Sequence, residues 1–404
     1  MTHSHAPRKA QPGSTSYDDD ARIRPTDSVG RVKPQYVTFS DESQVLNLES
    51  GGALAPVTVA YETYGTLSPE RDNAVLVCHA LSGDAHAAGY HGTDADEKPG
   101  WWDILIGPGK PLDTDRYFVI SSNFLGSCYG TTGPTNINPE TGKPYGPTFP
   151  FFTIRDMVEL QRWLLDYLEI DTLLAVTGGS MGGMQALQWA ISYPDRVRGT
   201  IPIATTAQMS AQGIAFNKVG RQAILSDPKW QNGNYLDTDP PDQGLALARM
   251  IEHITYLSEK SMHRKFARRF ANGNERSFNF SRDFQVESYL HHQGDKFVRR
   301  FDANTYLYIS KAMDYFDLVD DFGSLEEAFG DCLSSFLVLS FTTDWLFPAK
   351  QSQEIVRALR RLGKDVSYCN IESDQGHDAF LLPGHRQGDL IAGYLERLEK
   401  GGGT

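Results

Sequence analysis

One serine lies in a setting that favours nucleophilic chemistry. The apolar, β-rich residues 173–177 end at two glycines, Ser180 follows, and two more glycines lead into a helical pattern. Residues 178–182, Gly-Gly-Ser-Met-Gly, match the G-x-S-x-G turn, in which small residues relieve the crowding between a strand and a helix. Such a turn exposes the serine Oγ near backbone N–H groups at a helix N-terminus. A glycine-rich turn with an incidental serine has the same pattern, so the motif alone does not decide.

A serine nucleophile needs a base, and the base needs an acid that orients it. His377 lies in a loop after the last predicted strand, and Asp344 lies in the loop after the preceding strand. An isolated Asp in such a loop is usually a helix N-cap. However, Ser180, Asp344 and His377 follow one another in the order of an α/β-hydrolase triad, each just past a strand. Together they predict a catalytic triad.

The negative charge that forms during acyl transfer needs backbone N–H donors. The N–H of Met181, directly after the serine, is one candidate, and Leu81 in the strand-end turn 79–83 is the other, although an ordinary turn would look the same. Other chemistries find no support, since the chain has no H-E-x-x-H, no C-x-x-C, no complete Walker A motif and no dinucleotide-binding glycine pattern. We therefore expect no metal site and no bound cofactor.

Strand-like runs alternate with helical patterns on both sides of the serine. The apolar runs at 73–78, 117–121 and 335–340 suit strands buried on both faces, as in parallel sheets covered by helices. Between residues 208 and 328 the pattern is almost wholly helical. The sequence thus predicts an α/β-hydrolase fold, with a mostly parallel sheet and an inserted helical lid. Its predicted parts are a disordered tail (1–32), the core (33–205 and 329–399), the lid (206–328) and a flexible tail (400–404).

Composition limits the partners and the compartment. The 404 residues carry a formal net charge of −13, which argues against a nucleic acid or an anionic membrane as partner. No apolar run approaches the ~18 residues of a transmembrane helix. The four cysteines are scattered, and the polar N-terminal segment lacks the apolar core of a signal peptide. We expect reduced thiols and a cytoplasmic protein.

Eight stretches along the chain stand out together: YETYGTL at 61–67, CHALSG at 78–83, KPGWW at 98–102, GGSMGGMQAL at 178–187, AFN at 215–217, GRQAI at 220–224, HITYL at 253–257 and RFDAN at 300–304. With these stretches the chain resembles one family, the homoserine O-acetyltransferases of methionine biosynthesis, which belong to the α/β-hydrolase superfamily. The resemblance includes the lid, where general hydrolases differ, and extends from about residue 30 to residue 398.

The resemblance implies acetyl transfer from acetyl-CoA to the hydroxyl of L-homoserine, by a ping-pong mechanism in which Ser180 carries the acyl group and CoA is only a co-substrate. It further implies that Arg221 holds the homoserine carboxylate, that Asp378 holds its amine, and that Tyr256 lies near the substrate. By their residue types alone, these three could equally be a surface arginine, a loop cap and a core aromatic. Members of the family are usually homodimers.

Other functions stay open at this point. The acyl donor could be succinyl-CoA or the acceptor could be serine, as in related enzymes. A plain esterase is less favoured because the lid stretches match, and a catalytically silent binding protein is less favoured because Ser180, Asp344 and His377 are all present.

Overall fold

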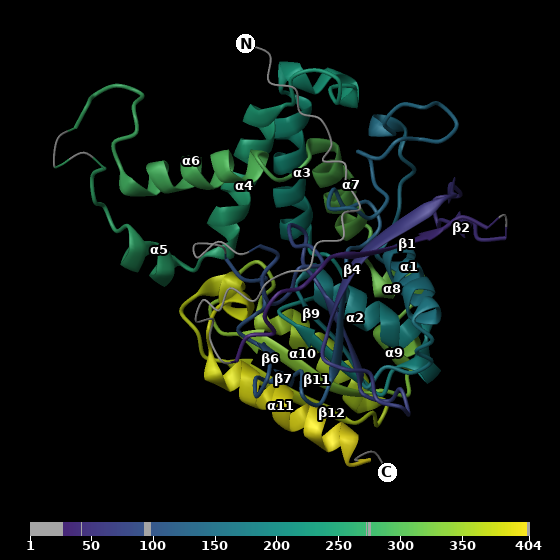
Figure 1. Cartoon of the computed structure of the whole chain (residues 1–404). Coiled ribbons are helices and arrows are strands. Elements are labelled where there is room, and N and C mark those ends of the chain that lie inside the picture. Colours follow the sequence, from purple (N-terminus) through teal and green to yellow (C-terminus); the bar gives the residue numbers. More distant parts are fainter. Residues whose placement is uncertain (1–26, 42, 93–97, 272, 274–275, 402–404) are drawn as a thin grey trace.

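An eight-stranded sheet forms the centre of the computed structural model, which describes residues 27–401 apart from 42, 93–97, 272 and 274–275 (Figure 1). β4 pairs antiparallel with β1 and β8, and the remaining neighbours are parallel. This confirms the predicted mostly parallel sheet. In spatial order its strands are β1 (Gln35–Phe39), β4 (Val57–Tyr64), β8 (Phe118–Ser122), β5 (Ala74–Cys78), β9 (Ala175–Gly179), β10 (Gly199–Ile203), β11 (Ser335–Phe341) and β12 (Val366–Ile371).

Apolar side chains of the central strands pack on both faces of the sheet, because successive residues of a strand point to opposite sides. Leu76 joins one buried cluster, whereas its neighbours Val75 and Val77 join the other. Helices α1 (Ile154–Tyr167), α2 (Met181–Ser192) and α10 (Ala349–Arg361) contribute to the first cluster, and α11 (His385–Glu399) contributes to the second. This two-sided covering is the α/β-hydrolase architecture expected from the sequence.

Helix α1 begins with a capping box between Thr153 and Asp156. Shorter elements complete the core. The short elements are β2 (Leu46–Asn47), β3 (Ala53–Leu54), β6 (Ile106–Gly107), β7 (Leu112–Asp113), α8 (Leu318–Phe322), α9 (Leu325–Phe329), and the 3₁₀ turns η1 (Gly146–Thr148), η2 (Pro194–Arg196), η3 (Pro228–Gly233) and η4 (Gly376–Leu381).

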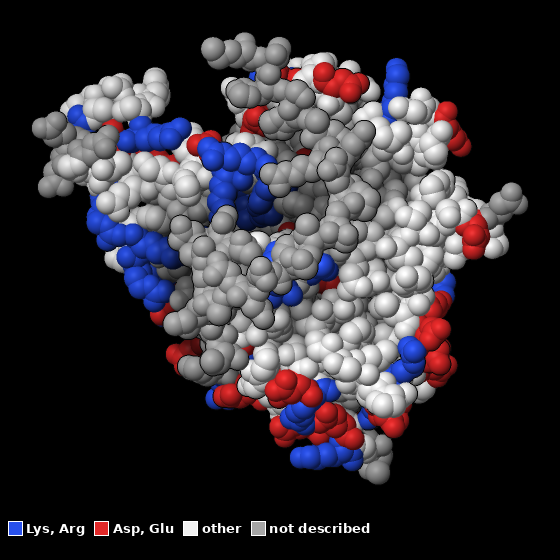
Figure 2. Space-filling model, in the orientation of Figure 1, with Lys and Arg blue, Asp and Glu red and all other residues white. Residues whose placement is uncertain are grey.

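Of the helices described between β10 and β11, α3 to α7 form the lid at one end of the sheet (Figure 1). α4 packs against both α3 and α6, and α3 also packs against α7. Figure 2 shows Lys and Arg side chains gathered over the α4–α6 part of this lid. The lid helices are α3 (Ala211–Leu225), α4 (Asp242–Tyr256), α5 (Glu259–Lys265), α6 (Gln285–Val298) and α7 (Ala303–Asp314).

Part of the predicted N-terminal tail is folded onto the core. The tail was expected to extend to residue 32, but the Val32 N–H bonds to the Tyr90 carbonyl at 2.9 Å, and Val29 and Val32 pack on the second apolar cluster. The apolar contacts of the two valines and a second bond, from the Tyr90 N–H to Gly30 O at 3.0 Å, keep this segment on the core. Residues 1–26 of the predicted tail, and 402–404 of the C-terminal one, lie outside the described residues.

None of the described helices has the length and apolar character needed to cross a membrane.

Candidate active site

Ser180 lies at the turn between β9 and α2, with φ 57° and ψ −123°. A residue with a side chain adopts this backbone conformation only under strain, and such strain concentrates at functional sites. Two hydrogen bonds hold the turn: the Ser180 N–H donates to Ile203 O at 2.9 Å, and the Thr205 hydroxyl donates to Ser180 O at 2.7 Å. The fold therefore presents the serine as the sequence motif predicts.

Close packing explains the glycines around the serine. A Cβ added at Gly182 would lie 2.1 Å from the carbonyl oxygen of Cys78, and one at Gly179 would lie 2.3 Å from the ring of Phe380. Real Cβ atoms do not approach other atoms so closely, so only glycine lets α2 pack against the end of β5 and lets β9 pack against Phe380 beside Ser180.

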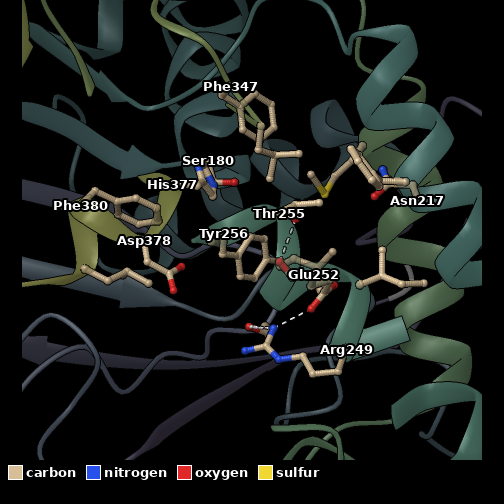
Figure 3. Close-up of a pocket in the computed structure, with 18 of the residues that line it drawn as sticks. Ser180, Asn217, Arg249, Glu252, Thr255, Tyr256, Phe347, His377, Asp378 and Phe380 are labelled. Atoms are coloured by element: carbon tan, nitrogen blue, oxygen red, sulfur yellow. Dashed lines mark hydrogen bonds and ion pairs between the residues drawn. The ribbon is translucent and has the colours of Figure 1, made fainter. Parts of the chain in front are cut away.

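The predicted base and acid lie together. His377 Nδ1 and Asp344 Oδ2 are 2.8 Å apart, and Asp344 Oδ1 accepts the N–H groups of Leu346 and Phe347 at 3.0 and 2.9 Å. The bond at Nδ1 leaves His377 Nε2 for the serine, and Ser180 and His377 line the same cavity (Figure 3). Burial lowers the pKa of His377, but the adjacent Asp344 carboxylate outweighs it, so that pKa lies above its ordinary value.

Two backbone N–H groups are available beside the serine. Met181 is the first residue of α2, so its N–H has no partner within the helix. Leu81 lines the cavity, and no hydrogen bond among the described residues uses its N–H. The turn that carries Leu81 is held by bonds from Gly83 N–H to Ala80 O at 3.0 Å and from Gln185 Nε2 to His79 O at 3.2 Å. This arrangement suits an oxyanion hole.

The cavity at the triad has a volume of about 150 Å³ and lies between the core and the lid. Its core side is formed by the turns that carry the triad and Leu81, and its lid side is formed mainly by α4. Apolar side chains surround the serine, including Phe347 and Phe380 (Figure 3). The cavity is thus a small space with a reactive serine at its wall.

A charged cluster lines the lid side of this cavity, and Arg249 on α4 is its centre. Arg249 Nη1 lies 2.6 Å from the Glu252 carboxylate and 3.4 Å from Ser82 Oγ (Figure 3). The Arg249 side chain is only 12% exposed. Burial raises the pKa of Glu252, and Arg249 opposes that shift. The sequence interpretation missed both residues.

The structure does not place Arg221, the predicted carboxylate ligand, at this cavity. Arg221 is on α3, and its guanidinium bonds instead to the Asp314 carboxylate and the Ser310 hydroxyl of α7. Its position on α3 turns it toward α7 and not toward the triad. We therefore correct this part of the prediction: the arginine that lines the cavity is Arg249.

Asp378 and Tyr256, the other two predicted substrate residues, both line the cavity. The Tyr256 ring lies 5.7 Å from the His377 ring, centre to centre. Burial raises the pKa of Asp378, while His377 and Arg249 oppose the shift. In Figure 3 the Asp378, Arg249 and Glu252 side chains stand around Tyr256, near the triad. The cavity therefore joins the triad to a cation and two carboxylates.

A helical spacing could have identified Arg249. It precedes Tyr256 by seven residues, which is two turns of a helix, so both side chains lie on one face of α4. Glu252 lies between them on the same face. This helical spacing could have pointed to Arg249 once Tyr256 was predicted to lie near the substrate. However, no local sequence pattern distinguishes Arg249 from the other arginines of the lid.

A second polar group lies outside the cavity, where β4 meets the loop after residue 84. The Glu62 carboxylate bonds to His86 Nδ1 at 2.9 Å, to His91 Nε2 at 2.5 Å and to the Tyr64 hydroxyl at 2.8 Å. Among the described residues, Glu62, His86 and His91 are the group whose ligand atoms are close enough to hold a metal ion. Their hydrogen bonds account for the arrangement by joining the loop to the sheet, so we assign no metal to them.

The chain is similar to known proteins over most of its length. Residues 73–383 match the α/β hydrolase fold family. A homoserine O-acetyltransferase of Deferribacter desulfuricans is 56% identical, over 92% of this chain and 97% of that protein. A homoserine O-succinyltransferase of Acidithiobacillus ferrooxidans is 54% identical, over 93% of this chain and 97% of that protein.

Solved structures similar to this chain include both an acyltransferase and an esterase. The homoserine O-acetyltransferase of Bacillus anthracis is 34% identical with a TM-score of 0.84, and the similarity covers 91% of this chain and 98% of that one. Esterase E22 is 31% identical with a TM-score of 0.82, covering 90% and 100% of the two chains. From the triad, the lid and these similarities, the chain belongs to the homoserine O-acetyltransferase family of α/β-hydrolase enzymes.

Proposed function

We propose that the protein transfers an acetyl group from acetyl-CoA to the hydroxyl of L-homoserine, with Ser180 as the temporary acyl carrier. The observation that carries the proposal is the pairing, in one cavity, of a serine triad with buried charges of both signs. An esterase of simple esters has no use for such charges. An amino acid acceptor requires them, since it brings a carboxylate and an ammonium group.

Arg249 is the residue that suits the carboxylate of the acceptor. A guanidinium offers two parallel N–H donors that match a carboxylate, and the exclusion of water strengthens the contact. Glu252 already occupies one side of the guanidinium and holds it in place at 2.6 Å. The role that the resemblance gives to Arg221 therefore passes to Arg249.

Asp378 suits the ammonium group of the acceptor. It follows His377 directly in η4, so a bound ammonium would lie close to the triad. Burial raises the pKa of Asp378, and a cationic substrate would favour its charged form. With the carboxylate on Arg249 and the ammonium on Asp378, the acceptor is held at both ends and its side-chain hydroxyl is free to approach Ser180.

In the first half-reaction His377 Nε2 accepts the Ser180 hydroxyl proton while Oγ attacks the thioester carbonyl. The N–H groups of Leu81 and Met181 bind the oxygen that becomes negative. The carbon–sulfur bond then breaks, CoA leaves with the proton from His377, and the acetyl group remains on Ser180. Asp344 stabilises the imidazolium that forms on the way.

In the second half-reaction the homoserine hydroxyl replaces the thiol. His377 accepts its proton, the hydroxyl oxygen attacks the acetyl carbonyl, and the ester to Ser180 breaks as His377 returns the proton to Oγ. Water could attack in the same way. The small apolar space around the serine, with Phe347 and Phe380 in its wall, favours a bound acceptor over bulk water.

The charges of the cavity favour acetyl over succinyl as the transferred group. A succinyl group ends in a second carboxylate, which would need a cation of its own. Arg249 is the one Lys or Arg among the described residues that line the cavity, and Glu252 and Asp378 are both acidic. With Arg249 engaged by the acceptor, a succinyl carboxylate would face those two acids. Succinyl-CoA remains the second candidate because one similar relative is named a succinyltransferase.

A thiol-release assay tests the proposal. Purified protein is mixed with acetyl-CoA or succinyl-CoA and with L-homoserine or L-serine, and free CoA is followed. Fast release is expected only with acetyl-CoA and homoserine, together with an acetyl-enzyme whose mass is found on Ser180. Equal release without acceptor would indicate a hydrolase, and the absence of release with every pair would refute the transferase.

We also propose a homodimer formed through the lid. Large apolar side chains of α3 and α4 are exposed, among them Val219 at 54% and Leu247 at 49%. They line one surface groove, and a two-fold axis would cover the same patch on both copies. Light scattering on the Val219→Glu/Leu247→Glu variant tests this, because a dimer whose interface contains these residues should dissociate.

We also propose that the protein is located in the cytoplasm. The four cysteines, which form no disulfide, support this location.

A further inference from the structure

Positive charge gathers on one side of an otherwise acidic molecule. Residues 259–300, which include α5 and α6, carry ten Lys or Arg and five Asp or Glu, whereas the whole chain has a net charge of −13. Figure 2 shows these basic side chains over the lid. A local excess of one sign in a chain of the opposite sign attracts anionic ligands to that place.

Part of this charge lies beside the cavity. The Phe297 ring is covered by the Arg249 guanidinium at 4.6 Å and by the Arg300 guanidinium at 5.2 Å. Arg300 Nη1 also donates to the carbonyl oxygen of Ser82 at 2.8 Å and lies 2.9 Å from the Tyr129 hydroxyl. Since Ser82 and Arg249 line the cavity, Arg300 stands next to it.

Two lysines extend the group outward. Partial burial lowers the pKa of Lys296, and so do the nearby positive charges of Lys98, Arg300 and Arg249. Among the described residues, Lys98, Lys296 and Arg300 form no ion pair, although the charge of Arg300 acts to lower the pKa of Asp84. Like charges held close together are unfavourable in the free protein, and the binding of an anion relieves the repulsion.

The volume of the cavity indicates which part of a large ligand would stay outside it, over these charges. About 150 Å³ holds an acetyl group and a small amino acid but not a nucleotide, since pockets that enclose drug-sized ligands have roughly 300–1,000 Å³. If the donor is a CoA thioester, as in the function proposed above, its phosphates must remain outside while its thioester reaches Ser180.

We propose that Lys98, Lys296 and Arg300 form a docking site for the phosphates of the CoA nucleotide at the mouth of the cavity. The three cations bind the phosphates and hold the thioester arm over Ser82, so that the thioester enters beside Leu81. Homoserine has no phosphate and gains nothing from this site. The contribution should therefore appear in the donor half-reaction alone.

A double variant, Lys98→Gln/Lys296→Gln, tests the site without changing a residue of the cavity wall. We expect the KM for acetyl-CoA to rise about tenfold, because two charge-assisted contacts to the phosphates are lost. The KM for S-acetyl-N-acetylcysteamine, which has the thioester but no nucleotide, should change less than about twofold. Added salt should raise the KM for acetyl-CoA more in the wild type than in the variant.

The matched control is Lys350→Gln/Lys400→Gln, which removes the same charge from exposed positions on α10 and after α11. It should leave both KM values unchanged. An equal rise for both donors in the Lys98/Lys296 variant, or no rise for acetyl-CoA, would overturn the proposed site.

Calorimetric titration with CoA alone separates this site from the proposed reaction. Wild-type protein should bind CoA, and the Lys98→Gln/Lys296→Gln variant should bind it about tenfold more weakly. Equal binding by both proteins, or no binding by either, would overturn the docking site whatever the enzyme catalyses. Binding with this loss but without acyl transfer would refute the proposed function and leave the site standing.

Discussion

The core and the lid contribute to the cavity in different ways. The core supplies its reactive groups from loops at the ends of strands, and buried backbone and glycine contacts fix each of them; Gly182, for example, leaves no room for a Cβ beside Cys78 O. The lid supplies Arg249, Glu252 and Tyr256 from one face of a single helix, where side chains hold one another. We infer that the core determines the chemical step and that, in the function proposed above, the lid determines which acceptor receives the acyl group.

Ser180→Ala gives the largest effect expected. Acyl transfer should fall by about 10⁴-fold or more, because no other described group in the cavity replaces the nucleophile. Thermal unfolding should stay within a few degrees of wild type, since alanine keeps the Cβ of serine at this turn. CoA release by the purified variant measures the effect. Turnover near the wild-type rate would mean that the chemical step does not belong to the core turn.

A pair of glycine variants tests whether the core is the stiffer region. Gly182→Ala places a Cβ 2.1 Å from a backbone carbonyl and should destabilise the fold by about 3 kcal/mol or more. Gly213→Ala in α3 places a Cβ 2.4 Å from the Cε of Met209, the far end of a flexible side chain. In addition, alanine favours the helix by up to about 1 kcal/mol. Denaturant unfolding should show a small change for Gly213→Ala, and equal losses would remove the contrast.

Arg249→Ala tests the role assigned to the lid. The kcat/KM for homoserine should fall about 100-fold, since contacts to a charged group contribute on the order of 1.5–3 kcal/mol. The first half-reaction, followed as the burst of CoA released in forming the acetyl-enzyme, should change by only a few-fold. Arg249→Lys keeps the charge and should recover part of the loss but not the paired N–H geometry. A burst that is lost together with transfer would place Arg249 in the chemical step.

The sequence predicted the core site well and the lid site poorly, for a physical reason. Ser180, Asp344 and His377 each follow a strand, and the ends of parallel strands meet at one edge of the sheet, so chain order alone brings them together. Arg221 and Arg249 lie on two helices of similar pattern. Which of them faces the cavity depends on how α3 and α4 rotate against each other and α7, and no local pattern records that rotation.

The fold shows the same limit. The buried strands and the helical block were visible as runs and periods of apolar residues. The docking of residues 27–32 was not, because it depends on Val32 meeting Tyr90, a partner far along the chain with no sequence signal of its own. Likewise Glu62, His86 and His91 come together only in three dimensions.

The pH dependence of acyl transfer gives an independent test of the core, through the protonation of His377. The adjacent Asp344 carboxylate outweighs burial and holds the pKa of His377 above its ordinary value of 6.5. The base must be neutral to accept a proton, so kcat/KM should fall about tenfold per pH unit below that raised pKa. Asp344→Asn removes the charge and leaves burial dominant, so the acid limb should move to lower pH while the rate falls. An unmoved limb would mean that another group, such as Asp378, controls it.

Arg221→Ala gives the smallest expected change in activity and completes the comparison of the two arginines. Its guanidinium is engaged by Asp314 and Ser310 on α7, so its loss should leave the KM for homoserine within about twofold of wild type. Stability should suffer instead, because Asp314 is 4% exposed and loses a charged partner, although the Asn217 amide still donates to it at 2.8 Å. We expect a lower unfolding temperature, partly restored by Arg221→Ala/Asp314→Asn. A KM rise comparable to that of Arg249→Ala would mean that Arg221 on α3, and not Arg249, binds the carboxylate of homoserine.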